Sequence, residues 1–339
     1  MPNFSKDDLL KIASSIFCAA GAVDDIAQQV SEVLVLNNLA GHDSHGILRI
    51  PEYLKSIETG EIVPNARPEI LSESVTTALV GGNWAFGQLT GLYAVDLAIS
   101  KAKKNQVSVV AAVQAGHTGR LAAFTDRAAK QGVVMFMTIG TTMQPVTAPY
   151  GGSTAVMGTN PMAFSLPYLG GAPISLDFAT SAIAAGKIKV AHANQENLPP
   201  NSILDKYGRP SIDPQDFIDG GVLLPFGGHK GYGLALIAEL LSGPLIGSEK
   251  FPGINKKNGI FIFAFDAEIF RPADEYEKSL EEVLGRIKSV PPREGFKEVL
   301  LPGERGVRSV ERREQDGIPV AESTWKAICL AAKSVGVNL

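Results

Sequence analysis

Two short turns carry most of the histidine in this sequence, and histidine is the side chain best suited to moving protons near neutral pH. The first turn, residues 41–46 (GHDSHG), contains His42 and His45. The second, about seventy residues later at 116–120 (GHTGR), contains His117; the chain has five histidines in all. Glycine beside a histidine lets the backbone come close to a bound molecule. A single histidine of this kind fits a structural role equally well, but two such turns favour an active site.

The first turn continues into a segment in which His45, Arg49 and Tyr53 are spaced four residues apart. If the segment is helical, all three side chains lie on one face. Arginine binds a carboxylate through two parallel hydrogen bonds, and histidine can protonate a nearby carbonyl oxygen. The trio therefore predicts a site for a small 2-oxo or 2-hydroxy acid. A solvated helix face is the alternative, and Pro51 weakens the helical geometry because it disfavours a helical conformation at Ile50.

Three further stretches place chemically useful residues next to predicted elements. His117 follows the apolar strand 107–113, and ligands of open α/β sheets gather beyond such strand ends. Lys230 lies in the glycine-rich stretch 227–233 at the start of an apolar helix, where backbone amides bind anions; an ordinary glycine-rich loop is the alternative. Asp177 ends another strand, although a helix cap alone would explain the polar residues that follow it.

Composition and missing motifs exclude several classes of protein. The 339 residues are 45% hydrophobic and 19% charged with a net charge of −4, which fits a compact globule and gives no basic surface for nucleic acid. No candidate strand is followed by G-x-G-x-x-G or by the Walker pattern, so an ordinary Rossmann domain is not predicted. Histidine and cysteine show no metal-ligand spacing, and no metal is expected.

Two further features bear on the protein's location. Cys18 and Cys329 are the only cysteines, and their apolar helical surroundings favour reduced thiols. The polar N-terminus does not read as a signal peptide, and the longest apolar runs are too short to span a bilayer. We therefore expect a cytoplasmic protein that does not bind membranes.

Hydrophobic periodicity predicts an α/β fold, a sheet covered by helices, with a small mostly helical domain formed by both termini. Ser5 and Asp8 form a capping-box-like start to the first helix. The expected helices are 9–17, 24–39, one starting near Pro51, 92–104, 121–130, 182–193, 232–241, 275–287 and 322–334; the expected strands are 79–80, 107–113, 133–139, 162–166, 174–176 and 260–265. Residues 158–161 and 302–305 are expected to be turns. We predict a helical domain of residues 1–66 and 306–339 that carries the Ser-His turn, and an α/β domain of residues 67–305.

The stretches described above together resemble the type-2 malate/L-lactate dehydrogenase family, which includes ureidoglycolate dehydrogenase, diketogulonate reductase, sulfolactate dehydrogenase and Δ1-piperideine-2-carboxylate reductase. The matching stretches run in order along nearly the whole chain: 41–53 (GHDSHGILRIPEY), 116–120, 149–161 (PYGGSTAVMGTNP), 177–187 (DFATSAIAAGK), 224–234 (LPFGGHKGYGL) and 302–305. The resemblance implies a nicotinamide cofactor, NAD in preference to NADP, held by a non-Rossmann fold. It also implies a homodimer with active sites near the subunit interface.

The resemblance also implies roles for individual residues. Acid/base work belongs to the pair matching Ser44 and His45 in some members and to the histidine matching His117 in others, so the choice stays open here. Arg49 and Tyr53 match substrate-side positions. The positions matching the cofactor side are Gly119, Arg120, Asp177, Phe178, Ala179, Lys230, Gly303 and Glu304. Asp177 is also the nearest candidate for a charge-relay carboxylate.

Within the family, the second histidine turn favours the hydroxycarboxylate branch. Imino-acid reductases tend to carry His-Phe-Ala there and an acidic residue near Lys187, whereas this chain has His117 followed by Thr118, Gly119 and Arg120. The predicted function is therefore an NAD(P)-dependent dehydrogenase that interconverts a 2-hydroxy acid and its 2-oxo acid. The alternatives are an imino-acid reductase of the Δ1-piperideine-2-carboxylate type and a catalytically silent ligand-binding protein on the same fold.

Overall fold

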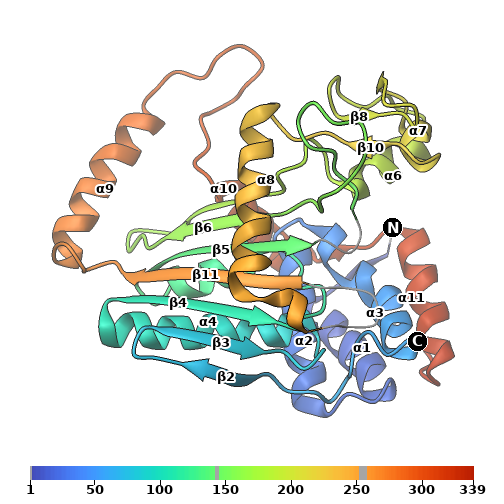
Figure 1. Ribbon diagram of the computed structural model, residues 1–339, viewed down its shortest axis with the longest axis horizontal. Coiled ribbons are helices and arrows are strands. Elements are labelled where there is room, and N and C mark those ends of the chain that lie inside the picture. The colour runs from blue at the N-terminus through green and yellow to red at the C-terminus, as the bar shows by residue number, and fades with distance from the viewer. Residues whose placement is uncertain (1, 142–144, 252–257) are drawn as a thin grey trace.

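A mixed seven-stranded sheet forms the centre of the computed structural model, which describes residues 2–141, 145–251 and 258–339 (Figure 1). Its strands, in order across the sheet, are β2 (Glu69–Glu73), β3 (Thr77–Gly81), β4 (Val107–Val113), β11 (Asn258–Asp266), β5 (Val133–Thr141), β6 (Met162–Leu166) and β7 (Ile174–Phe178). Only the β3–β4 pair is parallel; the other neighbours in this sheet are antiparallel. The strand directions therefore differ from the mostly parallel sheet of a doubly wound fold.

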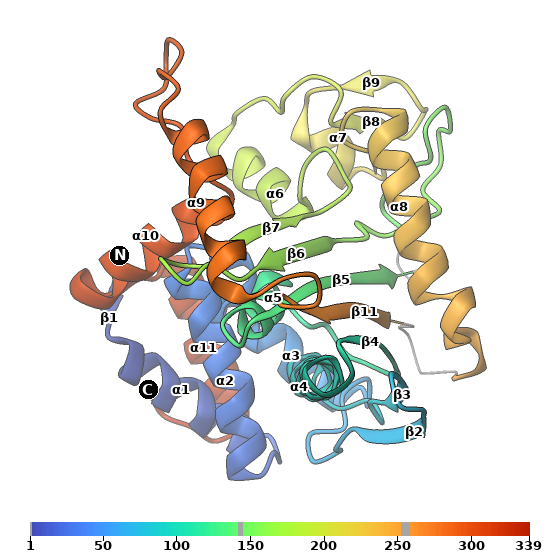
Figure 2. The same cartoon turned by 90° about the vertical axis from the view of Figure 1, so that its left-hand side faces the viewer.

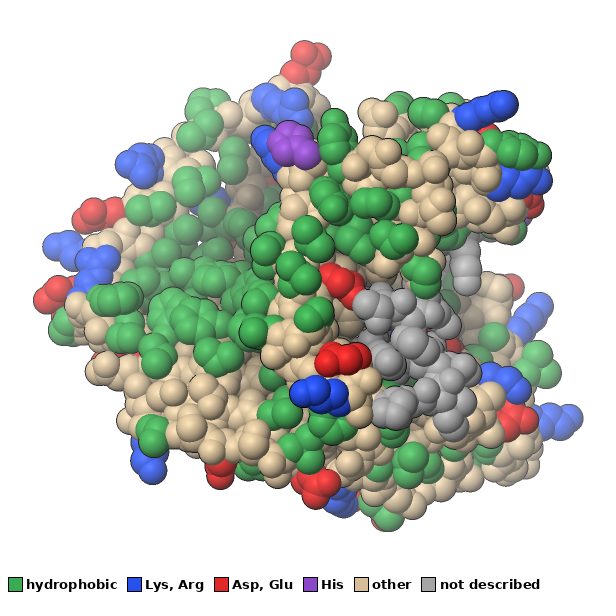
Figure 3. All heavy atoms as spheres, in the orientation of Figure 1, with side chains coloured by type: hydrophobic (Ala, Val, Ile, Leu, Met, Phe, Trp, Pro, Cys, Tyr) green, Lys and Arg blue, Asp and Glu red, His purple; other side chains and the backbone are tan. Residues whose placement is uncertain are grey.

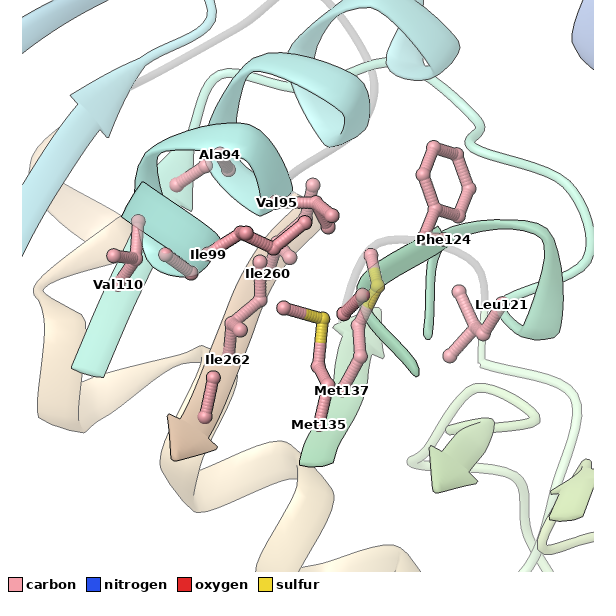
Figure 4. Close-up of a cluster of buried hydrophobic side chains, with 14 of the residues drawn as sticks. Ala94, Val95, Ile99, Val110, Leu121, Phe124, Met135, Met137, Ile260 and Ile262 are labelled. Atoms are coloured by element: carbon pink, nitrogen blue, oxygen red, sulfur yellow. The ribbon is translucent and has the colours of Figure 1, made fainter. Parts of the chain in front are cut away.

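Helices cover the two faces of the sheet unequally. α4 (Gly87–Asn105) and α5 (Ala122–Ala129) pack on one face, and α8 (His229–Ser242) packs on the other, mainly against β5 (Figure 2). The first face is a dry core because every second residue of β11 and β5 points into it. Figure 4 shows this cluster, which includes Ala94, Val95, Ile99, Val110, Leu121, Phe124, Met135, Met137, Ile260 and Ile262. The expected α/β class with a helix-covered sheet is confirmed.

The two ends of the chain meet beside this core. α1 (Lys6–Ala19), α2 (Asp24–Leu39) and α3 (Ile50–Glu58) share a second hydrophobic cluster with α11 (Glu322–Ser334). The short strands β1 (Asn3–Phe4) and β12 (Ile318–Pro319) pair antiparallel. Ser5 caps α1 by accepting a hydrogen bond from the Asp8 amide at 3.1 Å, as its spacing predicts. The domain boundaries at residues 66 and 306 remain a prediction.

Several elements were not expected from the sequence. A three-stranded sheet of two-residue strands, β8 (Ile203–Leu204), β9 (Pro210–Ser211) and β10 (Val222–Leu223), lies beside α6 (Ala185–Asn194) and α7 (Pro214–Ile218). Of the expected turn at 302–305, residues 302 and 303 form a turn, and the other two already belong to α10 (Glu304–Asp316), which packs on α2. α10 escapes a periodicity search because it is almost entirely charged or polar, with Val307 and Val310 as its apolar contacts. The helix expected at 275–287 does form: it is α9 (Ala273–Lys288), which stands away from the sheet (Figure 1).

Two smaller expectations can be compared directly. Cys18 and Cys329 are both free thiols and partly buried. Within the described residues, no helix combines the length and apolar character needed to cross a bilayer.

Candidate active site

Two buried asparagines at the end of α2 shape the turn that carries Ser44 and His45. The side-chain amide of Asn38 donates to Asp43 Oδ1 at 2.6 Å, and its oxygen accepts from the Ile47 amide at 2.8 Å. Asn37 donates to the His45 carbonyl at 3.0 Å. A Cβ on Gly46 would lie 2.0 Å from the Asn38 oxygen, so only glycine fits there. The turn is therefore fixed by α2, an element that precedes it in the chain.

The segment from His45 to Tyr53 is not one continuous helix, so the condition for a shared helix face is not met. Residues Asp43–His45 and Ile47–Arg49 are two separate 3₁₀ turns, and α3 begins only at Ile50. Gly46 is extended between them, with φ −94° and ψ −150°. The physical reason is the Asn38 contact, which holds the chain in a non-helical path that sequence spacing does not reveal. The expected helix start near Pro51 is therefore confirmed, and the three side chains do not share one helix face.

Arg49 and Tyr53 consequently have different surroundings. The Arg49 guanidinium donates to the Ser44 carbonyl at 2.7 Å and to the Glu52 carboxylate at 2.5 Å, and it remains 26% exposed. Tyr53 is 1% exposed. Its hydroxyl lies 2.8 Å from Nδ1 of His117, in the second histidine turn. Arg49 is thus partly exposed in an ion pair with Glu52, whereas Tyr53 contacts His117.

The two histidine turns meet face to face. The rings of His45 and His117 stack with their centroids 5.7 Å apart and an interplanar angle of 16°. Ser44 Oγ lies 3.0 Å from His45 Nδ1. Gln88, at the start of α4, donates from Nε2 to the Tyr53 hydroxyl at 2.7 Å. Sequence reasoning missed Gln88 because its first-turn position on α4 carries no signal that it faces a residue 35 positions earlier.

Electrostatics favour neutral imidazoles at His45 and His42, both in the first turn. Desolvation lowers the pKa of His45 from 6.5 to about 4, and the positive charges of Arg49, His42 and Arg120 add to the shift. The pKa of His42 falls to about 4, again first by desolvation and then by Arg120. A neutral imidazole can accept a proton, and the surrounding cations favour a bound anion. The turn is therefore suited to taking a proton from an anionic substrate.

The start of α6 lies over the first turn. A Cβ on Gly186 would lie 3.7 Å from the Ser44 Cβ, and the charge of Lys187 contributes to the lowered pKa of His42. This segment follows β7 in the chain. The stretch 177–187 therefore links the end of the sheet to the Ser44–His45 turn.

Asp177 lies within β7 rather than after it. Its carboxylate is partly buried and accepts a hydrogen bond from the Ala122 amide at the start of α5, at 2.8 Å. Desolvation raises its pKa, while the Ala122 amide and Arg120 oppose that rise. Asp177 thus caps α5, and the polar residues after it do not cap α6, whose N-cap is Ala184. Its expected catalytic and cofactor roles remain predictions.

The other residues expected at the cofactor side lie at loop and helix starts. Phe178 packs edge-on against Phe226, with ring centroids 5.4 Å apart, which brings the loop before Lys230 beside the end of β7. Gly119 has φ +92°, and Gly303 has φ +94° directly before Glu304 at the start of α10. The location of Ala179 follows from that of Phe178, its neighbour at the end of β7. These placements do not test the roles.

A cleft of about 430 Å³ is lined by two of the residues expected at the cofactor side. It runs between α2, α5, the start of β7 and α10. Arg120 and Gly303 both line it, together with Asp126, Ser175 and Glu32. Arg120 is 12% exposed, with its guanidinium 3.9 Å from Asp126 and its Nε 3.4 Å from the Asn37 side chain. The volume falls in the range that small molecules and parts of cofactors occupy.

Glu304 is already engaged in an ion pair. Its carboxylate accepts from Lys288 at 2.9 and 3.0 Å and from the Leu301 amide at 2.9 Å. These contacts close the turn before α10. Among the residues that the structure describes, no group of three or more His, Cys, Asp or Glu side chains is arranged to hold a metal ion.

Comparison with known proteins identifies the family. The malate/L-lactate dehydrogenase family model matches residues 4–329, and the chain belongs to this family. The resemblance inferred from the motifs is thereby confirmed. Its members include dehydrogenases named for hydroxy acids.

Individual relatives cover almost the full length. The chain is 32% identical to a malate/(S)-sulfolactate dehydrogenase of Methanothermus fervidus, covering 99% of this chain and 98% of the relative. It is 35% identical to an L-sulfolactate dehydrogenase of Methanocaldococcus jannaschii, covering 97% and 96%.

Solved structures agree with the fold. A putative malate/lactate dehydrogenase of E. coli superposes with a TM-score of 0.94 at 32% identity, covering 99% of this chain and 96% of that one. A Δ1-piperideine-2-carboxylate reductase from Pseudomonas syringae pvar. tomato superposes with a TM-score of 0.85 at 29% identity, covering 98% and 100%.

Proposed function

We propose that this protein is an NAD(P)-dependent oxidoreductase that interconverts a 2-hydroxy acid of the malate or lactate type and its 2-oxo acid. The observation that carries the proposal is the stacked pair of His45 and His117, with the Arg49 guanidinium beside the same turn. A proton acceptor and a carboxylate-binding group then lie within one small site. The names of the relatives, which include malate and sulfolactate, support the substrate class.

In this proposal the chain's own residues bind the acid and move its hydroxyl proton. Arg49 binds the substrate carboxylate, with its guanidinium oriented by the Ser44 carbonyl. A neutral imidazole accepts the hydroxyl proton during oxidation. The bound carboxylate raises the pKa of His45 from about 4, because a nearby anion stabilises the imidazolium. The nicotinamide, when bound, accepts the hydride from C2.

The residues near the cleft fit such a cofactor. Gly303 lies against β7, and a Cβ there would come within 3.0 Å of the Ser175 side chain, so the glycine keeps this wall open. Gly227, before Lys230, has φ +57° with open space around it. We place the nucleotide of the cofactor in the cleft beside Arg120, with NAD preferred and NADP possible. Quenching of NADH and NADPH fluorescence by the protein, compared with Gly303→Val, measures this without any substrate.

The structure also supports a homodimer. Figure 3 shows a broad hydrophobic surface between α8 and α9. On neighbouring strands of the sheet, Phe136 pairs in register with both Phe263 and Phe164, so their aromatic side chains lie on one face. Phe263 is 38% exposed. An apolar sheet face of this kind marks an interface. We propose that a second copy covers it, and that Phe263→Glu yields monomers in sedimentation while Leu330→Glu on α11 does not.

An imino-acid reductase is the second candidate, supported by the similarity to the piperideine-2-carboxylate reductase structure. The residues Thr118–Arg120 after His117 count against it. A silent binding protein is the third candidate, and a cytoplasmic location stays a prediction. Absorbance at 340 nm separates all three candidates. The oxidised cofactors NAD and NADP are tested with malate, lactate and sulfolactate, and the reduced cofactors are tested with 2-oxo acids and with Δ1-piperideine-2-carboxylate. Turnover of a 2-hydroxy acid supports the proposal, turnover of the imine alone supports the second candidate, and no change with any pair refutes both enzymes.

A further inference from the structure

A buried series of hydrogen bonds connects α4 to His117 in the second histidine turn. Gln88 is fully buried, and its Nε2 donates to the Tyr53 hydroxyl at 2.7 Å. The hydroxyl lies 2.8 Å from His117 Nδ1. Gln88 Oε1 is buried without a hydrogen-bond partner among the residues that the structure describes. Tyr53 thus contacts one nitrogen of His117, Gln88 holds the Tyr53 hydroxyl, and neither side chain lines the cleft.

The donor and acceptor order in these hydrogen bonds determines which ring nitrogen of His117 carries the proton. Because Gln88 donates to the Tyr53 oxygen, the single phenolic proton points onward. It can go to Nδ1 of His117 at 2.8 Å or to the His117 carbonyl at 3.4 Å, and the second distance is long for an O–H donor. Nδ1 is then an acceptor, and the proton of the neutral ring sits on Nε2.

Tyr53 acts as a fixed donor rather than as a proton carrier. Burial raises its pKa well above the usual phenol value, so a phenolate there is strongly disfavoured. If His117 took up a proton, its Nδ1–H would point at the Tyr53 hydroxyl. The phenolic proton could then be donated only to the His117 carbonyl, 3.4 Å away. His45 faces no such obstacle, because the Ser44 hydroxyl at its Nδ1 can rotate to accept or donate.

We propose that Gln88 and Tyr53 are positioning residues that hold His117 with its proton on Nε2, so that His117 donates a hydrogen bond to the substrate oxygen and His45 takes up the hydroxyl proton. The proposal rests on the function proposed above. In oxidation the O–H bond breaks and its proton moves to His45, while the C2–H bond breaks and its electron pair leaves as hydride to the nicotinamide. A neutral histidine that donates to a developing oxyanion is a known device.

The first test needs no substrate or cofactor. Nitrogen-15 NMR of the full chain distinguishes the protonated from the bare nitrogen of each histidine ring, and His117→Gln assigns the signals. We expect His117 to carry its proton on Nε2. Gln88→Glu should move that proton to Nδ1, because a carboxylate accepts the phenolic proton and the Tyr53 oxygen then accepts from the ring. Thr90→Val, which removes another buried polar group of α4, should leave the His117 signals unchanged.

The outcomes are separable from the fate of the enzymatic proposal. A wild-type His117 protonated on Nδ1 overturns the inference, whatever the activity. If Gln88→Glu does not fold, Tyr53→Phe replaces it: Nδ1 loses its donor, and the midpoint of the His117 titration should rise. An unchanged midpoint in Tyr53→Phe contradicts the inference.

Kinetics give the second test once a substrate is known. Gln88→Met should lower kcat by about fivefold, the effect of one lost hydrogen bond, while leaving the acidic limb of the pH profile in place. That limb belongs to His45, whose ring is faced by His42 and Arg49, by Arg120 from the second turn and by the stacked His117. A shift of the limb in Gln88→Met would show that His117 is the proton acceptor.

Discussion

Arg313 on α10 ties the C-terminal part of the chain to the first histidine turn. Its guanidinium donates to the Asn38 carbonyl and binds the Asp43 carboxylate through two hydrogen bonds of 2.7 and 3.0 Å. The side chain is 12% exposed, and Asp43 is 50% exposed. Asp43 directly precedes Ser44 and His45. We predict that Arg313→Ala both destabilises the protein and reduces turnover.

The size of the effect follows from these contacts. A hydrogen bond from a charged group to a mostly buried carbonyl contributes about 1.5 kcal/mol or more. The pair with half-exposed Asp43 adds at most about 1 kcal/mol because water screens it. The free energy of unfolding should therefore fall by about 2 kcal/mol, which lowers the apparent Tm by about 3 °C in a chain of this length. Since loosening the turn displaces His45, kcat should fall at least about tenfold.

Thermal unfolding and turnover of the variant measure both effects. Arg312→Ala is the matched control, because Arg312 is an exposed arginine on the same helix. Arg313→Lys should give an intermediate result, since lysine keeps the charge and loses the two-pronged geometry. If Arg313→Ala and Arg312→Ala have the same Tm and kcat, the role assigned to Arg313 is refuted.

Two other perturbations probe the same turn. Gly46→Ala should lower the free energy of unfolding by about 2 kcal/mol, because its Cβ would lie 2.0 Å from the Asn38 oxygen. Gly285→Ala should raise it by about 0.5 kcal/mol, because a Cβ there meets open space within α9. Urea unfolding measures both variants, and equal free energies of unfolding would contradict this reasoning. Acidification from pH 6.5 to about 4 should lower the free energy of unfolding. The reason is that His42 and His45 bind protons in this range in the unfolded chain, whereas their lowered pKa keeps them neutral in the folded protein. His45→Gln should make this loss smaller, and an unchanged pH dependence would show that the imidazole is not desolvated.

The sequence predicts the central strands well because their signal is local. Residues 107–113 form an apolar run that coincides with β4. Side chains of β11 alternate between the hydrophobic core and the opposite sheet face, which carries Phe263. The two-residue strands β8, β9 and β10 carry no such pattern, because they are too short for a period. α10 is too charged, and its place on α2 depends on partners such as Asp43 far earlier in the chain.

The site shows the same division between local and distant information. Residue type and glycine flanks single out His45 and His117, but their stacking depends on how α2 and α4 approach each other. Spacing alone predicts a helix through His45, and the buried Asn38 overrides it. Gln88 was not predicted at all, because its importance lies in the tyrosine that it contacts.

The central claim is that the His45 imidazole exchanges the substrate's hydroxyl proton within this site. The most direct measurement is kcat for the best 2-hydroxy acid with His45→Ala, beside His192→Ala as a control at an exposed histidine hydrogen-bonded to Gln215. General acid–base catalysis contributes about 10²–10⁴-fold, so His45→Ala should lose about that factor while His192→Ala keeps normal turnover. A kcat of His45→Ala within tenfold of the unmodified protein would contradict the account.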